Sequence, residues 1–247
     1  MENILSKVDV ANNRDLFIQI LKNCVNRDGS NLDALISKLD SSGFFFSPAT
    51  TQYHCSYYGG LCNHSLDVFF NLIRLSCNKM GYDFNKLHAF AIKSEDSSSA
   101  VEYTYEDELS EEEKKLLESC AITGLLHDMC KMGKFESMVK NVKVYSNSGN
   151  CQDSGGKYEW KAIEGYQLKK SQDRFLFGTN GETSEFMVRQ FIPLNVDESI
   201  AIINSCGDTE NNSNRGSNIA ALFNRYSLPV LLHCADLISC YLDERVE

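Results

Sequence analysis

The most constraining feature of the chain is the segment GLLHDMCKMG at residues 124–133, where a histidine and an aspartate end an apolar run. Apolar residues recur at spacings of three and four through residues 116–125, which predicts a helix whose buried face continues to His127 and Asp128. A carboxylate that is buried without a partner is costly. Other parts of the fold must therefore bring complementary groups to this helix end.

Two further predicted helices carry polar groups of the same kind on their apolar sides. In GGLCNHSLDVFFNLIRLSCNKMG, residues 59–81, His64 falls on the face that the leucines share. In SLPVLLHCADLISCYLDE, residues 227–244, His233 and Asp236 are three apart and lie beside the apolar face. A divalent cation would neutralise both aspartates and use the imidazole nitrogens. Spacing alone leaves open the alternative of separate polar residues, each with its own hydrogen bonds.

Helical periodicity predominates along the rest of the chain, so we expect a mainly α fold. Ser110 and Glu113 have the spacing of a capping box, which predicts that a helix begins near Glu111. Two strand-like runs around a Ser/Asn/Gly-rich turn predict a small inserted β-hairpin at about residues 139–163. The other expected helices cover residues 14–26, 31–40, 183–192 and 196–205.

The sequence contains no internal repeat and no clear domain boundary. We therefore expect a single domain over residues 1–247, with an N-terminal helical extension at 1–48 and a core at 50–245. Residues 94–113 hold nine acidic residues and no basic one, which predicts an exposed loop that leads into the next helix. Residues 207–218 are expected to form a second polar loop.

Charge is unevenly distributed over the chain. The net charge of −10 argues against a long nucleic acid as partner. Residues 131–174 nevertheless hold nine Lys or Arg against five Asp or Glu, which is +4 and leaves −14 for the remainder. This basic segment is either a solvated face of the hairpin or a rim that attracts anions.

Features of export and of membrane insertion are missing from the sequence. No apolar run approaches the roughly 20 residues needed to span a bilayer, and the first residues lack a basic start followed by an apolar block. The ten cysteines are scattered through apolar segments, without a CxxC pair. We therefore expect a cytoplasmic protein with reduced thiols, no membrane partner and no thiolate zinc site.

Three blocks, in this order, resemble the HD-domain superfamily of metal-dependent phosphohydrolases. HCSYYGGLCNHS, residues 54–65, is similar to the glycine-glycine-leucine entry into that family's first metal-ligand helix. GLLHDMCKMGKF, residues 124–135, resembles the end of its His-Asp helix, and LPVLLHCADLISCYLDE, residues 228–244, resembles its terminal helix. The resemblance covers residues 50–245 and implies an HD-type helical bundle with a metal held between helices.

The resemblance also implies which residues hold the metal. His64, His127, Asp128 and Asp236 would be the ligands of one divalent cation, such as Mn, Fe, Co, Ni or Zn. Such a cation lowers the pKa of a bound water and polarises a phosphoryl oxygen. Lys131 lies about one helical turn beyond Asp128. We expect it to stabilise charge on the phosphate, so that Lys131 and Asp128 are the catalytic residues.

His54, His233 and Lys134 are expected to contact the substrate. His54 and His233 have the alternative of packing without a role in the site, and Lys131 has the alternative of being an ordinary surface lysine. His88 is expected to be structural.

The chain departs from the family pattern at one point. Many HD proteins that cleave phosphodiesters carry two more histidines between the His-Asp pair and the last aspartate, and these complete a two-metal site. The corresponding stretches here read FLFGTNGETSEF and AIINSCGDTE, and no histidine lies between Asp128 and His233. Thr179-Asn180 and Asn204-Ser205-Cys206 stand where those histidines would be. A second metal of that kind is therefore not expected.

The resulting hypothesis is a metal-dependent phosphohydrolase that attacks a nucleotide or a similar small phosphoester with a metal-activated water. The alternative is a protein that binds or sequesters a nucleotide in a degenerate HD site with little or no turnover. A third option is a purely structural metal site in an interaction protein, for which the coordination sphere should be closed. The sequence does not predict the base, the number of phosphates or the oligomeric state.

Overall fold

The computed structural model describes residues 9–93, 108–175, 177–206 and 216–244. The predicted acidic loop lies outside the described residues from 94 to 107, and so does most of the second polar loop, from 207 to 215.

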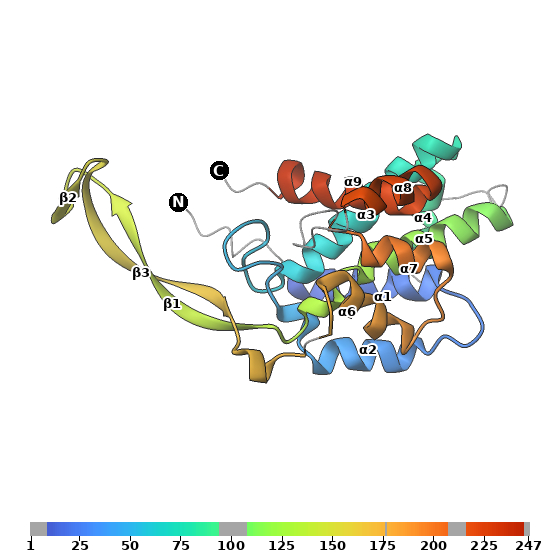
Figure 1. Cartoon of the computed structure of the whole chain (residues 1–247), viewed down its shortest axis with the longest axis horizontal. Helices are drawn as coiled ribbons and strands as arrows, with labels where there is room; N and C mark the ends of the chain where they lie inside the picture. Colours follow the sequence, from blue (N-terminus) through green and yellow to red (C-terminus); the bar gives the residue numbers. More distant parts are fainter. Residues whose placement is uncertain (1–8, 94–107, 176, 207–215, 245–247) are drawn as a thin grey trace.

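The described chain is mainly helical and carries one small antiparallel sheet (Figure 1). The helices are α1 (Val10–Cys24), α2 (Leu32–Ser41), α3 (Gly60–Met80), α4 (Phe84–Ala91), α5 (Glu111–Leu126), α6 (Asn180–Arg189), α7 (Val196–Ile203), α8 (Gly216–Arg225) and α9 (Ser227–Ile238). Short 3-10 turns are η2 (Phe44–Phe46), η3 (Met129–Lys131) and η4 (Ser171–Asp173), and a π-helical turn, η6 (Ser239–Asp243), continues α9. The coarse prediction of a mainly α fold with a small β insertion is confirmed.

Local sequence signals account for several helix starts. Ser110 accepts a hydrogen bond from the Glu113 backbone amide, and the Glu113 carboxylate accepts one from the Ser110 amide, so the predicted capping box of α5 is present. Thr179 caps α6 in the same way, and Asn195 caps α7. Helices α4 and α8 were not expected from the sequence. Both are short, and helices of this length depend on tertiary packing for most of their stability.

The core lies around α3, whose buried side chains meet those of α1, α5 and α9. Phe17 of α1 and Phe69 of α3 belong to the same buried cluster, so residues before 48 contribute directly to the core. Gly124 allows α5 to approach α3 closely, because a Cβ added there would lie 2.8 Å from the Phe69 Cα. This contact brings the end of α5, with His127, next to the first turns of α3, with His64.

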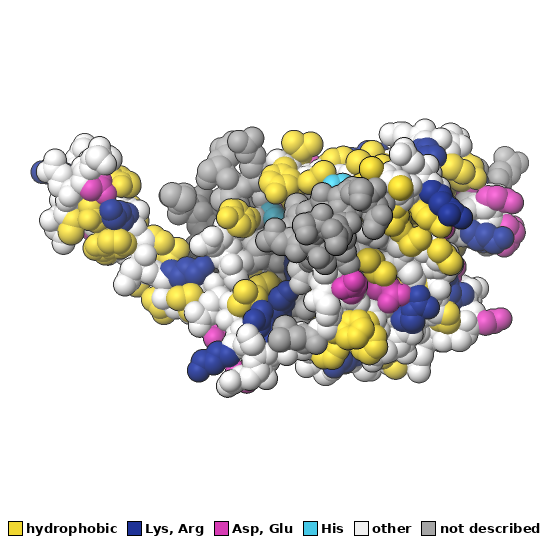
Figure 2. Space-filling model, in the orientation of Figure 1, with side chains coloured by type: hydrophobic (Ala, Val, Ile, Leu, Met, Phe, Trp, Pro, Cys, Tyr) yellow, Lys and Arg dark blue, Asp and Glu magenta, His cyan; other side chains and the backbone are white. Residues whose placement is uncertain are grey.

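The sheet is a long hairpin that projects from the helical body (Figure 1). Strand β1 (Phe135–Tyr145) pairs antiparallel with β3 (Gly156–Leu168), and the short β2 (Cys151–Asp153) pairs with β3 near the tip. The hairpin is thus longer than the predicted range of about 139–163. Hydrophobic and basic side chains lie along it (Figure 2), including exposed Val139 and Trp160. Its residues supply none of the buried core of the described chain.

Among the described helices, none combines the length and the apolar character that crossing a bilayer would require.

Candidate metal centre

Two histidines and two aspartates from three elements meet at one end of α3. His64 lies on α3, and its Nε2 is 3.3 Å from Asp236 Oδ1 and 3.5 Å from Asp128 Oδ2. His127 follows α5, and its Nε2 is 3.5 Å from Asp128 Oδ2 and 3.9 Å from Asp236 Oδ1. Both imidazoles are buried, and their ring centroids are 5.3 Å apart. The four residues expected to be ligands are therefore brought together.

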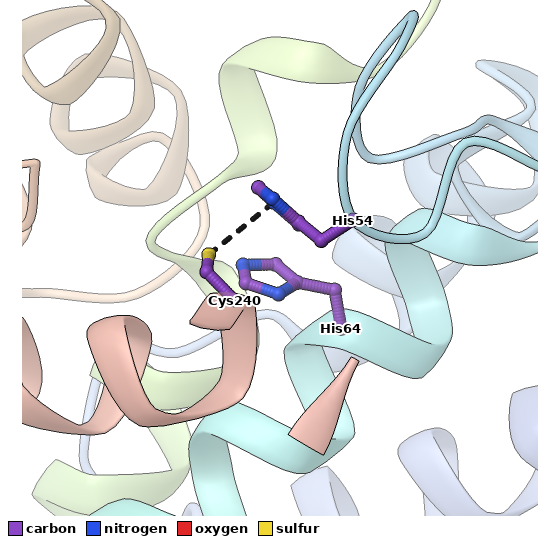
Figure 3. Close-up of side chains that lie close together, drawn as sticks. All are labelled: His54, His64 and Cys240. Atoms are coloured by element: carbon purple, nitrogen blue, oxygen red, sulfur yellow. Dashed lines mark hydrogen bonds between the residues drawn. The ribbon is translucent and has the colours of Figure 1, made fainter. Parts of the chain in front are cut away.

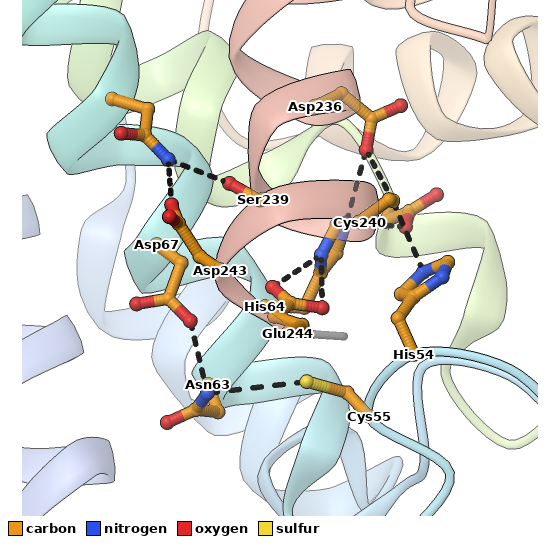
Figure 4. Close-up of polar contacts among 12 residues, drawn as sticks. His54, Cys55, Asn63, His64, Asp67, Asp236, Ser239, Cys240, Asp243 and Glu244 are labelled. Atoms are coloured by element: carbon orange, nitrogen blue, oxygen red, sulfur yellow. Dashed lines mark hydrogen bonds and ion pairs between the residues drawn. The ribbon is translucent and has the colours of Figure 1, made fainter. Parts of the chain in front are cut away.

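The other nitrogen of each ring has a partner that fixes the ring's orientation. His64 Nδ1 lies 3.0 Å and 3.2 Å from the two carboxylate oxygens of Glu244 (Figure 4). His127 Nδ1 donates to the Gly124 carbonyl oxygen at 2.9 Å. These contacts fix each ring with its Nε2 toward the carboxylates, so that Nε2 is the nitrogen that would bind a cation once the ring is neutral.

Each Nε2 is buried and, beyond its ion-pair contacts with the carboxylates, makes no well-aligned hydrogen bond within the described chain. Buried polar atoms without a partner are uncommon in native proteins. Two such nitrogens that face two carboxylates are a donor set suited to a transition-metal cation, because imidazole and carboxylate are ordinary ligands of such ions. The residues present therefore fit a divalent cation.

Asp128 is held by Lys131 as well as by the imidazoles. The Lys131 Nζ lies 2.5 Å from Asp128 Oδ2, and the Lys131 side chain is only 16% exposed. Lys131 is thus a largely buried lysine beside the site, not the surface side chain of the alternative. Burial disfavours the charged carboxylate, but Lys131, His127 and His64 outweigh it and lower the pKa of Asp128 to about 2.

The carboxylates of the centre favour a protonated imidazole or a bound cation between them. Burial alone would lower the pKa of His64, yet the carboxylates of Asp236 and Glu244 raise that pKa to about 10. Burial would raise the pKa of Asp236, but its contact with His64 holds that pKa well below the usual range. Three carboxylates, those of Asp128, Asp236 and Glu244, thus surround the imidazoles, with Lys131 as the neighbouring basic side chain. A bound cation would offset this excess of negative charge.

A second group of ligand-type side chains overlaps the first (Figure 3). His54 is half-buried, and its Nε2 lies 3.3 Å from Cys240 Sγ. The Cys240 thiol also donates to Asp236 Oδ1 at 3.3 Å, and the His54 and His64 ring centroids are 5.0 Å apart. Burial, with the nearby charges of His64 and Lys131, lowers the pKa of His54 to about 4, so the ring is neutral at pH 7.

The described chain therefore contains two overlapping sets of residues that could hold a metal ion. One consists of His64, His127 and Asp236, and the other of His54, His64 and Cys240. Within each set the ligand atoms all lie within 4.8 Å of one another. Asp128 belongs to neither set, although its Oδ2 lies 3.5 Å from both Nε2 atoms.

Two residues expected to contact the substrate, Lys134 and His233, instead form hydrogen bonds away from the centre. Lys134 donates to Asn180 Oδ1 at the start of α6, at 2.6 Å. His233 Nδ1 donates to the Ser205 carbonyl oxygen at 2.7 Å, and its ring lies against Phe223. Neither side chain forms a hydrogen bond or an ion pair with the centre, so the structure does not bring them into it. Local spacing placed His233 near Asp236, but packing of α9 on α7 turns it toward Ser205.

Cys240 and Glu244 lie at the centre although neither was expected there from the sequence. Both follow Asp236 at intervals of four, so one helix face carries all three, and this spacing was an available signal. Their exact direction depends on the π-helical turn between Ser239 and Asp243, which local sequence does not predict. Such turns occur frequently at functional sites.

Comparisons of the chain with protein-family models, with curated proteins and with solved structures find no match. The residues of the centre and the resemblance seen in the sequence therefore support the function proposed below.

Proposed function

We propose that the protein is a metal-dependent phosphohydrolase of the HD type that acts on a nucleotide or a similar small phosphoester. The observation that carries the proposal is the pair of buried Nε2 atoms of His64 and His127, which lack a well-aligned hydrogen bond and face the carboxylates of Asp128 and Asp236. These four residues would hold one divalent cation. When bound, the cation would supply Lewis acidity toward a phosphoryl oxygen and would lower the pKa of water.

The protein's own side chains have distinct tasks in this proposal. Glu244 and the Gly124 carbonyl orient the two imidazoles, so that the nitrogens that bind the cation need not reorganise. Lys131 supplies a fixed positive charge beside Asp128, where it can stabilise negative charge on a phosphate. His54 lies beside His64 and has the position to contact a substrate group.

A second candidate function is nucleotide binding without turnover. The observation that favours it is the close ion pair between Lys131 and Asp128, which already neutralises that carboxylate without a cation. Thr179 caps α6, and the Ser205 carbonyl oxygen accepts from His233. Both residues stand at positions where HD phosphodiesterases carry histidines. Their contacts are structural, so they supply no replacement for those histidines.

A substrate screen separates the two candidates. The full chain is incubated with nucleoside mono-, di- and triphosphates, cyclic nucleotides and dinucleotides, each with Mn²⁺, Fe²⁺, Co²⁺, Ni²⁺ or Zn²⁺. If the protein is a hydrolase, the wild type should form product and Asp128→Ala should show only background rates. Asp33→Ala, which changes an exposed aspartate of α2, should retain the activity. A nucleotide that raises the melting temperature without product formation would favour the second candidate and contradict the first.

A further inference from the structure

Cys240 lies directly beside the proposed cation site. It is the second residue of the π-helical turn that continues α9, and it follows Asp236 by four residues. Its Sγ is 3.3 Å from Asp236 Oδ1 and 3.3 Å from His54 Nε2 (Figures 3 and 4). The thiol therefore touches one residue of the proposed cation site and one imidazole outside it.

An independent feature points to a ligand at the same place. The Nε2 of His64 is buried and has no hydrogen-bond partner in the described chain, and His64 belongs to the group formed with His54 and Cys240. Neighbouring ligand atoms that bind one ion at about 2.0–2.3 Å lie roughly 3–4 Å from one another. The spacings of 3.3 Å at Cys240 and of 3.3 Å between His64 Nε2 and Asp236 Oδ1 fall in that range.

We infer that Cys240 is a thiolate ligand of the cation at His64, with His54 as an additional imidazole ligand, so that the centre takes a thiophilic divalent ion of the zinc class rather than magnesium. This inference rests on the proposed cation site but not on hydrolysis. It also reverses the expectation, drawn from the lack of a CxxC pair, that no thiolate site exists. The sulfur comes from η6, the π-helical turn after α9, and the imidazoles come from α3 and the segment before it, so no local motif would reveal the set.

The chemistry of the ligand set determines the selectivity. Thiolate sulfur favours ions such as Zn²⁺ and Co²⁺, whereas Mg²⁺ is bound by oxygen ligands and retains its waters. On binding, the Cys240 Sγ–H proton leaves to solvent, and the Sγ–H···Oδ1 hydrogen bond to Asp236 is replaced by a bond from Sγ to the ion. The ion keeps its oxidation state.

Cobalt spectroscopy on the full chain tests this inference. Metal is removed with a chelator, Co²⁺ is added, and absorption is recorded in the near ultraviolet, where thiolate-to-cobalt charge transfer appears, and in the visible, where cobalt d–d bands appear. The wild type should show both. Cys240→Ser should lose the charge-transfer band and keep d–d absorption, while Cys234→Ser, which changes an exposed cysteine on the same helix, should keep both.

A measurement on the wild type guards against a variant that fails to fold. Alkylation of Cys240, followed by peptide mass mapping, should be suppressed by Zn²⁺ and not by Mg²⁺, and alkylation of Cys234 should not depend on the metal. Cobalt d–d bands without charge transfer, or a charge-transfer band that survives in Cys240→Ser, would overturn the inference.

The outcomes for the two proposals differ. Charge transfer in a protein that hydrolyses none of the substrates would support the thiolate ligand and reject the phosphohydrolase. Hydrolysis by a protein that binds cobalt without a charge-transfer band would support the phosphohydrolase and reject the thiolate ligand. A wild type that binds no cobalt would overturn both.

Discussion

Replacing Glu244 with glutamine tests how the carboxylate behind His64 contributes to metal affinity. Glu244 Oε1 and Oε2 lie 3.0 Å and 3.2 Å from His64 Nδ1, and the Glu244 side chain is 3% exposed. The buried negative charge favours the tautomer with the proton on Nδ1 and raises the basicity of Nε2. Glutamine keeps the size of the side chain and removes the charge, so the orientation of the imidazole and its basicity both weaken.

The magnitude follows from the position of Glu244 behind a ligand. Loss of such a partner typically lowers metal affinity by about 10–100-fold, which corresponds to about 1.4–2.7 kcal/mol. We expect a decrease of this size for Zn²⁺ or Co²⁺, measured at pH 7 by competition with a chromophoric chelator.

A neighbouring carboxylate supplies the matched control. Asp243 Oδ2 accepts from Asn71 Nδ2 at 2.8 Å, and the Asp243 side chain is not a partner of His64 in the described structure. Asp243→Asn should change the affinity by less than about tenfold. If Glu244→Gln folds normally, as judged by its circular dichroism, and binds metal as tightly as the wild type, the role assigned to this carboxylate is wrong.

Three further predictions concern stability. Arg27→Ala should lower the free energy of unfolding by about 3–5 kcal/mol in urea, because it removes the ion pair at 2.7 Å from Glu198, whose side chain is fully buried. Gly124→Ala should cost about 1–3 kcal/mol in the same assay, because the added Cβ meets the Phe69 backbone. Replacing residues 142–161 with an Asn-Gly turn should change the melting temperature by only a few degrees in calorimetry, because the hairpin supplies none of the described core.

The Arg27 prediction has a pH dependence of defined sign. Burial opposes ionisation of Glu198, but its hydrogen bonds to Arg27 hold the pKa below the usual value. The pair therefore stabilises the protein above the unfolded pKa of about 4.3, and this stabilisation is lost as pH falls through the lower folded pKa. Arg14→Ala, at a partly exposed pair with Asp40, is the control and should cost about 1 kcal/mol or less. Equal losses in the two variants at pH 7 would contradict the argument.

Helical periodicity predicted the parts of the site that lie on regular helix faces. His64 on α3 and His127 at the end of α5 are buried as the three-and-four spacing indicated, because a core-facing stripe fixes the direction of each side chain. The capping box at Ser110 was also predictable, since both of its partners lie within one helical turn.

Contacts between distant segments were not predictable from local pattern. His54 meets Cys240 across 186 positions of sequence, and Lys134 meets Asn180 across 46. These pairs depend on how α9 and α6 pack, and a sequence taken alone does not specify that packing. Lys131 differs from these pairs, because its ion pair with Asp128 spans only three positions in the turn after α5.

The proposed centre requires one cation shared by side chains from α3, the end of α5 and α9, and native mass spectrometry with added Zn²⁺ or Co²⁺ tests this most directly. The wild type should retain bound metal, His127→Ala should lose it, and His88→Ala, which alters a ring packed on Phe70 and Phe84, should retain it. A wild type without bound metal, or a folded His127→Ala with the same metal content as the wild type, would contradict the account.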